Sequence, residues 1–126
     1  MNANEFVAAL VSEVHQPSCQ DTASSLSKPP GRRPTKRSQD LSTWYNALSP
    51  ADARRVHEVI EHAVHAALFG TLCVLDGARP IGSERVELHL LAAGEKSSER
   101  LNDPKSRDLH DIYQAAVYEH VFGTTP

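Results

Sequence analysis

The sequence predicts one mostly helical α+β domain with a small antiparallel β-hairpin. A chain of 126 residues has room for one domain around a single hydrophobic core. Apolar residues recur at helical spacing in four segments, whereas they alternate with polar residues over one short stretch, residues 85–92. We therefore expect helices at 4–15, 41–48, 50–75 and 108–121, packed on a hairpin near 85–102.

The N-terminal third of the chain divides at a proline. Residues 1–16 are expected to form an amphipathic helix, which Pro17 ends because proline lacks a backbone N–H and clashes with the preceding turn. Residues 17–39 are rich in serine, proline and basic side chains and have no apolar period. They predict a linker or surface strap, which leaves residues 40–126 as the helical core with its hairpin.

The helix predicted at 41–48 is amphipathic by spacing. Asp40 stands where a capping side chain would begin it. Its apolar side chains fall at i, i+3, i+4 and i+7 and are expected to be buried: Leu41, Trp44, Tyr45 and Leu48. The only tryptophan of the chain is thus predicted to anchor the core.

The longest helix, predicted at 50–75, has a clear start and a clear end. Ser49 can accept a hydrogen bond from a free amide, Pro50 suits the first helical position, and Asp52 suits the positive end of the helix dipole. Asp76-Gly77 is expected to end the helix because glycine readily adopts the left-handed conformation. One side carries apolar residues that are expected to face the core: Val56, Val59, Ile60, Ala63, Val64 and Ala67.

The opposite side of this helix is crowded with histidine and glutamate, namely His57, Glu58, Glu61, His62 and His65, with Arg54 at its head. Pairs spaced i,i+3 or i,i+4 could chelate a metal ion, and the candidate ligands are His62, His65, Glu58 and Glu61. The spacing nevertheless misses His-Glu-x-x-His, His-x-x-Glu-His and Glu-x-x-His. We interpret this side as a solvated face that contacts a partner and expect no cofactor. A metal-dependent enzyme stays as an alternative.

The C-terminal part predicts a hairpin followed by a helix. Residues 85–92 alternate between apolar and polar side chains, and Gly94 lies at a plausible turn into a return strand at 98–102. Asp108 is expected to cap the last helix.

A run of five positive charges lies in the predicted strap: Lys28, Arg32, Arg33, Lys36 and Arg37. Such a run could bind nucleic acid or an acidic protein surface. No aromatic side chain is interleaved with the charges for base stacking, and the net charge of −3 is not typical of a nucleic-acid-binding protein. A linker or a contact with an acidic partner is favoured, and a nucleic-acid-binding accessory protein is the alternative.

No pattern typical of catalysis or of membrane insertion is present. The chain has no Gly-x-Ser-x-Gly and no glycine-rich phosphate loop, so we expect no catalytic residue. Cys19 and Cys73 lack metal-ligand spacing and indicate reduced thiols, which predicts a cytoplasmic protein. We find no targeting segment and no run that approaches the 18 apolar residues of a membrane span, so no membrane contact is expected.

Three strings of the chain form a further pattern: Trp44-Tyr45-x-x-Leu48-Ser49, Phe69-Gly70-x-Leu72-Cys73-Val74-Leu75-Asp76-Gly77 and Leu109-His110-Asp111-Ile112-Tyr113. With Pro29-Pro30-Gly31-Arg32-Arg33-Pro34 they resemble a pattern in small uncharacterised bacterial proteins, over about residues 29–113. The resemblance implies no known activity. By analogy of fold alone, small acidic α+β proteins of this size are often immunity partners of toxins.

These observations predict a small cytoplasmic interaction protein rather than an enzyme. We expect an immunity-type inhibitor that binds a toxin or effector, and a homodimer is left open. The expected contact residues are Arg32, Arg33, Arg54, His57, Glu58, Glu61, His62 and His65.

Overall fold

The computed structural model describes residues 1–123, without the side chains of residues 120 and 121. It is a mostly helical α+β domain with one two-stranded antiparallel sheet, which confirms the predicted fold class. In order along the chain, its elements are α1 (Ala3–Leu10), η1 (Val11–His15), α2 (Gln16–Ser27), α3 (Lys36–Asn46), α4 (Pro50–Leu75), β1 (Leu91–Ala93), β2 (Ser98–Arg100), α5 (Leu109–Val117) and η2 (Tyr118–Phe122).

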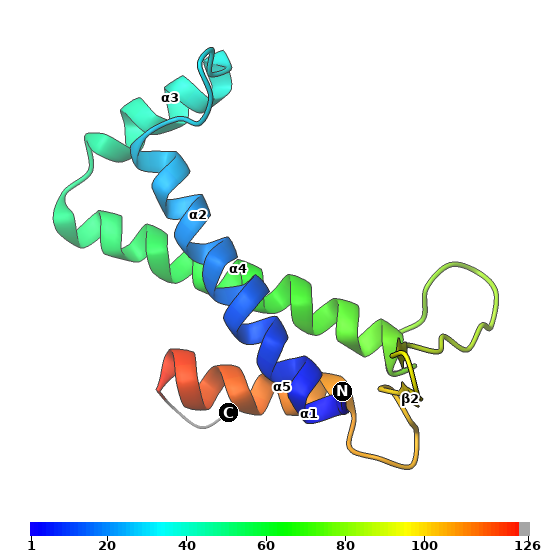
Figure 1. The fold of residues 1–126 in the computed structure, drawn as a ribbon. Coiled ribbons are helices and arrows are strands. Elements are labelled where there is room, and N and C mark those ends of the chain that lie inside the picture. Colours follow the sequence, from blue (N-terminus) through cyan, green and yellow to red (C-terminus); the bar gives the residue numbers. More distant parts are fainter. Residues whose placement is uncertain (124–126) are drawn as a thin grey trace.

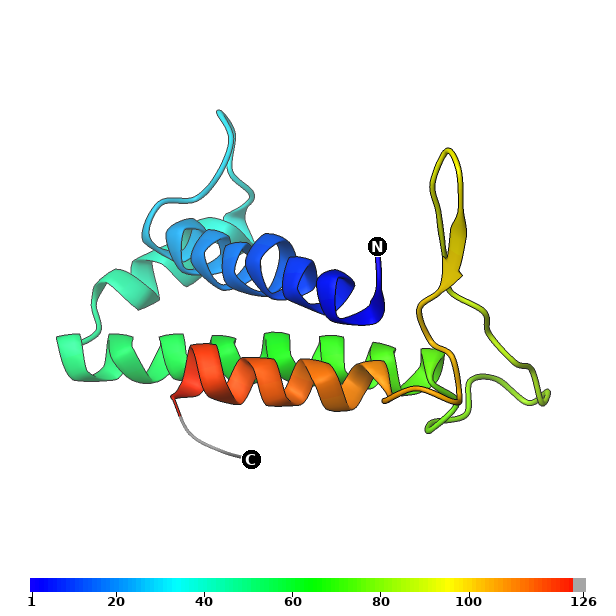
Figure 2. The same ribbon diagram turned by 60° about the horizontal axis from the view of Figure 1, so that its bottom comes forward.

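The helices form two layers. The segments α1, η1 and α2 make one continuous N-terminal helix, which crosses α4 and packs on it through α2 and on α5 through α1 (Figure 1). In the second layer α5 lies alongside α4 (Figure 2). The buried apolar side chains of the core come from both layers and from the residue that follows β2: Val7, Val11, Leu72, Leu101, Leu109, Tyr113 and Val117.

The N-terminal helix does not end at Pro17, which corrects the predicted helix 4–15 and shortens the linker predicted at 17–39. The helix continues to Ser27, and only residues 28–35 connect it to α3. The π-helical turn η1 ends two residues before the proline, and the N–H of Gln16 donates to the carbonyl of Val11. This wider turn accommodates a residue that has no N–H to give to the preceding turn.

The wider turn also aligns one face of the N-terminal helix. The buried residues of this helix are spaced four apart: Val7, Val11, His15 and Cys19. In an α-helix, residues four apart are rotated by about 40°, so such a series would wind off the interface. The i,i+5 bonding of η1 reduces this drift, and His15 and Cys19 therefore point into the molecule with the two valines.

The predicted bounds and both predicted ends of α4 are confirmed. Ser49 accepts a hydrogen bond from the backbone N–H of Asp52 at 3.1 Å. At the other end Gly77 has a φ of +77° and donates to Val74, while Ala78 donates to Cys73. These two bonds form a Schellman motif, which satisfies the last carbonyl groups of the helix.

The prediction of which side of α4 faces the core is wrong for part of the helix. Val59 is 66% exposed, and Ala63 and Ala67 are exposed as well, whereas Glu61 and His65 turn inward and are partly buried. The reason is that apolar residues surround the second half of this helix, so the sequence period does not mark one side uniquely. The side that α2 and α5 cover carries the two polar residues.

The prediction that the apolar side chains of α3 are buried is also wrong. Trp44 is 52% exposed and Leu41 is 44% exposed, so the tryptophan is not a core anchor. The buried side chain is Ser42, which donates to the carbonyl of Ser27 at the end of α2. The start differs too, because Thr35 rather than Asp40 caps the helix by accepting from the N–H of Ser38.

The hairpin is shorter than predicted. β1 and β2 pair in the register Leu91↔Arg100, Ala92↔Glu99 and Ala93↔Ser98, and residues 85–90 are not a strand. Figure 2 shows the hairpin projecting on the same side of the molecule as the N-terminal helix.

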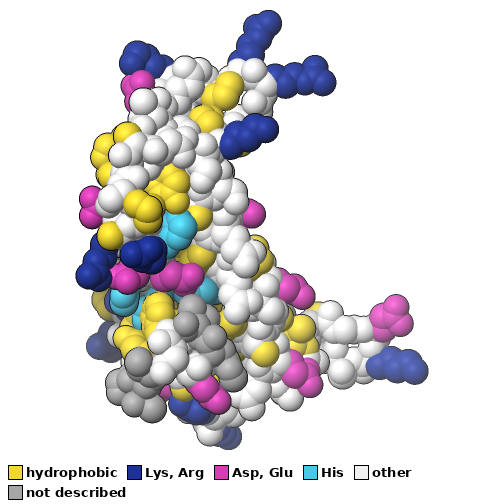
Figure 3. All heavy atoms as spheres, turned by 90° about the vertical axis from the view of Figure 1, so that its left-hand side faces the viewer, with side chains coloured by type: hydrophobic (Ala, Val, Ile, Leu, Met, Phe, Trp, Pro, Cys, Tyr) yellow, Lys and Arg dark blue, Asp and Glu magenta, His cyan; other side chains and the backbone are white. Residues whose placement is uncertain are grey.

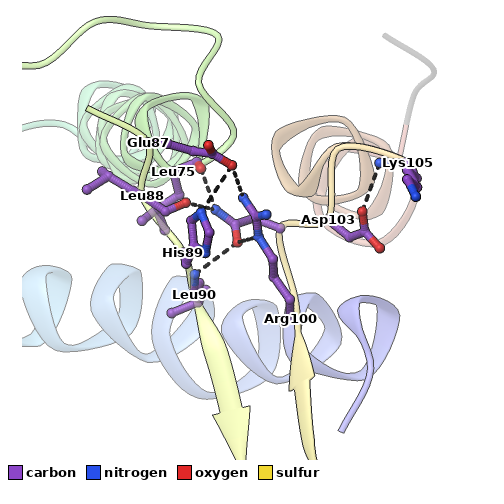
Figure 4. Close-up of polar contacts among 9 residues, drawn as sticks. Leu75, Glu87, Leu88, His89, Leu90, Arg100, Asp103 and Lys105 are labelled. Carbon is purple, nitrogen blue, oxygen red and sulfur yellow. Dashed lines mark hydrogen bonds and ion pairs between the residues drawn. The ribbon is translucent and has the colours of Figure 1, made fainter. Parts of the chain in front are cut away.

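A single buried asparagine, Asn102, attaches the hairpin to α4. Figure 4 shows the polar contacts at Leu75, Leu88 and Leu90. Asn102 donates to the carbonyls of Leu75 and Leu88 at 2.5 and 2.7 Å, and it accepts from the N–H of Leu90 at 2.9 Å. Nearby, Glu87 accepts from Arg100 at 3.0 Å. These side-chain hydrogen bonds take the place of the backbone hydrogen bonds that a longer pair of strands would have formed.

One helix differs from the expectation that no segment could span a membrane. By length and composition α4 could cross a bilayer, with a mean hydropathy of 1.4 over its most apolar 18-residue window. Only 17% of that window is buried. Core helices of water-soluble proteins pass the same test, so this property alone assigns no location.

Candidate functional site

A buried polar cluster lies where the N-terminal helix crosses α4 and α5. His15 is fully buried and contacts both neighbouring helices through its two ring nitrogens. Its Nδ1 lies 2.7 Å from the hydroxyl of Tyr113 on α5, and its Nε2 lies 3.0 Å from Oε2 of Glu61 on α4. Cys19 is one turn after His15 and is also buried. The crossing therefore brings an imidazole, a thiol, a carboxylate and a phenol together.

The same crossing has an open side. A groove of about 330 Å³ lies between α2 and α4. Its lining residues are Cys19, Gln20, Ala23, Ser24, His57, Ile60 and Glu61. Because the thiol of Cys19 and the carboxylate of Glu61 belong both to the cluster and to this lining, the cluster can be reached from solvent through the groove.

The protonation of the cluster follows from its burial. Burial raises the pKa of Cys19 to about 12, and the neighbouring carboxylate of Glu61 adds to this as hydrogen-bond acceptor and negative charge. Burial also raises the pKa of Tyr113, with smaller contributions from Cys19 and Glu61. Without a cation in the site, the thiol and the phenol are both protonated at neutral pH, so Cys19 is not an activated nucleophile.

His65 lies next to this cluster in an aromatic setting. Its ring stacks on Tyr113 with the centroids 5.5 Å apart, and Phe69, Tyr118 and Phe122 also contact it. Its Nε2 is buried without a hydrogen-bond partner. Burial lowers the pKa of His65, and the nearby His15 and His62 lower it further, so the ring is neutral at physiological pH.

The residues predicted on the polar face of α4 do not form one site. Of the four proposed metal ligands, Glu61 joins His15 and His65 joins the aromatic cluster, but Glu58 pairs with Arg55 at 3.1 Å. His62 stacks on Phe122, with the centroids 5.1 Å apart. The structure therefore divides this face between the interior and the surface.

The other predicted contact residues lie on the surface. His57 is exposed, and its Nε2 is 2.7 Å from the hydroxyl of Tyr45 on α3. Arg54 is exposed at the start of α4, and Arg32 and Arg33 are exposed in the connection between α2 and α3. Figure 3 shows lysine and arginine side chains gathered at the end of the molecule that α3 and this connection form.

Two groups of side chains in the described part of the chain have the donor types and separations that a metal ion requires. In the first, donor atoms of His15, Cys19 and Glu61 all lie within 4.8 Å of one another, and the second consists of Asp108, His110 and Asp111. The second group has an explanation without a metal, because acidic side chains favour the first turn of a helix and His110 is bonded to Asp76.

The sequence reasoning missed His15, Cys19 and Tyr113. The spacing His15-x-x-x-Cys19 would have indicated two side chains on one helical face, but the expected stop at Pro17 separated them. Nothing in the sequence around Tyr113 indicates its polar contact with His15.

Comparisons of the chain with protein-family models, with curated proteins and with solved structures find no match. The resemblance to small bacterial proteins over residues 29–113 therefore stays a prediction of the sequence.

Proposed function

We propose that this protein acts by binding another protein, of the toxin or effector class, as a cytoplasmic non-enzymatic inhibitor. The observation that carries the proposal is the exposed face of α3. Trp44 and Leu41 are 52% and 44% exposed there, whereas the other aromatic residues of the chain are buried or partly buried. Exposed tryptophan next to arginine is typical of the residues that dominate binding energy in protein interfaces.

The spacing on α3 supports a continuous contact face. Arg37, Leu41 and Trp44 follow each other at i, i+4 and i+7, which places them on one side of the helix. A groove of about 360 Å³ lies beside them, and Leu26, Pro30 and Leu41 contribute to its lining. An apolar side chain of a partner could enter this groove while Trp44 contacts its surface.

The charges favour an acidic partner. Arg32, Arg33 and Arg37 are exposed, and among the described residues they form no ion pair, whereas Lys36 pairs with Asp40 at 2.9 Å. Complementary charge at the rim of an interface accelerates association and selects the partner. The expected partner surface is therefore acidic with an exposed apolar group, and its binding weakens as the salt concentration rises.

The experiment uses the single tryptophan as a probe. Partner candidates captured on the native protein are purified and titrated against it, and we expect the Trp44 emission to shift to shorter wavelength as the ring is covered. Trp44→Ala should weaken binding by about 2 kcal/mol or more. Val59→Ala is the matched control, because Val59 is exposed on α4, and it should leave binding unchanged.

A nucleic-acid-binding protein and a homodimer would give different results, in oligonucleotide binding and in sedimentation. A nucleic-acid-binding protein would bind an oligonucleotide with a steep dependence on salt, and would lose that binding when Arg32, Arg33 and Arg37 are replaced by serine. A homodimer would show concentration-dependent sedimentation that Trp44→Ala abolishes. Either result, or capture that Trp44→Ala leaves unchanged, would contradict the proposal.

A further inference from the structure

The buried cluster at the helix crossing contains three side chains that can donate to the same point. A ring nitrogen of His15, Sγ of Cys19 and a carboxylate oxygen of Glu61 are mutually within 4.8 Å. His15 and Cys19 come from successive turns of the N-terminal helix, and Glu61 comes from α4. A nitrogen, a sulfur and an oxygen donor are together the set that zinc binds in proteins.

The separations suit a tetrahedral ion. Zinc binds nitrogen and oxygen at about 2.0–2.1 Å and sulfur at about 2.3 Å, so ligand atoms in a tetrahedron are about 3.3–3.6 Å apart. The distance between His15 Nε2 and Glu61 Oε2 is 3.0 Å, close to such an edge. The sulfur of Cys19 lies within 4.8 Å of both other donor atoms.

The surroundings hold the donors and favour a cation. Tyr113 contacts Nδ1 of His15 at 2.7 Å, and a partner on the second ring nitrogen fixes the orientation of a metal-binding histidine. Among the described residues, His15 is the only basic group that pairs with Glu61, so no lysine or arginine neutralises this carboxylate. His65 brings no positive charge, because burial lowers its pKa.

We propose that His15, Cys19 and Glu61 bind a zinc ion whose fourth position opens into the groove between α2 and α4. Three protein ligands with one open position are the arrangement in which zinc keeps a water or accepts a further ligand. His57 lines the same groove, with its Nε2 bonded to the hydroxyl of Tyr45. The proposal does not depend on the partner-binding surface of α3, which lies on other residues.

Binding of the ion changes the protons of the cluster in a defined way. Cys19 loses its thiol proton to solvent, because only the thiolate coordinates zinc. The Nε2 of His15 gives its lone pair to the metal, so the neutral ring carries its proton on Nδ1 and donates it to the hydroxyl oxygen of Tyr113. Affinity should therefore rise with pH, and binding should release at least one proton per ion.

The test uses the full chain, purified without a histidine tag and freed of metal with a chelator. We expect titration with zinc to give about one equivalent bound with a Kd below about 1 μM. Cobalt(II) placed in the same site should produce the near-ultraviolet band of a cobalt–thiolate bond and the visible bands of a tetrahedral ion. The band shows that a thiolate coordinates the ion, and in Cys73→Ser this thiolate can only be Cys19.

Variants separate this site from the other thiol and from the surface histidines. Cys19→Ser and Glu61→Gln should weaken zinc binding at least about 100-fold, and Tyr113→Phe, which removes only a supporting group, about 10-fold to 100-fold. Cys73→Ser and His62→Gln are the controls, because neither residue belongs to the cluster, and both should bind like the unchanged protein.

Circular dichroism of each metal-free variant shows whether it has folded. Should Cys19→Ser fail to fold, the cobalt–thiolate band of Cys73→Ser, which keeps Cys19 as its single thiol, tests the same coordination. Binding of less than about a tenth of an equivalent, or binding that Cys19→Ser and Glu61→Gln leave intact, overturns the proposal and makes the cluster a structural hydrogen-bond network.

Discussion

Asp76, at the end of α4, holds the start of α5 through His110. Its Oδ2 accepts from the backbone N–H of His110 at 2.8 Å and from the ring Nδ1 at 2.7 Å. The carboxylate of Asp76 is 1% exposed. Asp108 occupies the predicted cap position of α5, but its side chain makes no capping hydrogen bond. The helix is thus capped by a residue 34 positions away in the sequence.

Replacing Asp76 with alanine should destabilise the protein by about 1–3 kcal/mol, because it leaves the N–H and the ring nitrogen of His110 without their shared acceptor. The free energy of unfolding in urea, followed by circular dichroism, measures this loss. Asp111→Ala is the matched control. Asp111 is exposed and lies 3.5 Å from the other ring nitrogen of His110, so its removal should cost less than about 1 kcal/mol. Equal losses in the two variants would refute the capping role of Asp76.

Two glycines, one within α4 and one just after it, should respond in opposite directions to replacement by alanine. Gly77 has a φ of +77°, and an alanine there should cost about 1 kcal/mol. Gly70 lies within the helix, where alanine is favoured by up to about 1 kcal/mol. A Cβ at this position would meet only the Arg79 guanidinium, 2.5 Å from Nη1, and this flexible side chain can move aside. Thermal unfolding of Gly70→Ala and Gly77→Ala tests the pair, and a loss of stability in Gly70→Ala would mean that Arg79 is held in place.

The parts of the fold that depend on local chemistry could be predicted from the sequence. Ser49 and Gly77 mark the two ends of α4 because capping requires particular residues at particular backbone positions. The end of the N-terminal helix could not be placed in this way. A proline normally stops a helix, and nothing in the local sequence marks the wider turn before Pro17, which occurs where Val11 and His15 are buried.

Which face of a helix is buried was harder to predict than where the helix lies. Trp44 has the spacing of a buried residue, but α3 packs on α2 through Ser42 instead. Glu61 and His65 belong to the polar side of α4 by sequence and yet face the interior. Their burial depends on partners from distant segments, His15 and Tyr113, and no periodicity within α4 carries that information.

Cys19 should react slowly with alkylating reagents in the folded, metal-free protein. Burial and the neighbouring Glu61 raise its pKa to about 12, so at pH 8 the reactive thiolate is rare. We expect alkylation by iodoacetamide, followed by mass spectrometry in the presence of a chelator, to be at least about 100-fold slower than in urea. Glu61→Gln removes the negative charge beside the thiol and should accelerate the reaction. Rapid alkylation of Cys19 in the native protein would contradict its placement at the helix crossing.

His65 should make the protein sensitive to mild acid. Burial, and then the nearby His15 and His62, lower its pKa from the ordinary value of 6.5 in the folded state. Just below pH 6.5 the unfolded chain therefore binds a proton that the folded chain does not, so the free energy of unfolding falls as the pH falls. Above pH 6.5 both states are neutral at this residue, and its contribution to stability is complete.

Phenylalanine at position 65 keeps a ring against Tyr113 and Phe69 and cannot be protonated. We expect His65→Phe to flatten the loss of stability below pH 6.5, measured by urea unfolding at a series of pH values. It should not lower stability at pH 8, because it also removes the buried Nε2 that has no hydrogen-bond partner. His89→Gln, on the exposed segment before β1, should leave the pH profile unchanged. An unaltered acid slope in His65→Phe would show that another group carries the sensitivity.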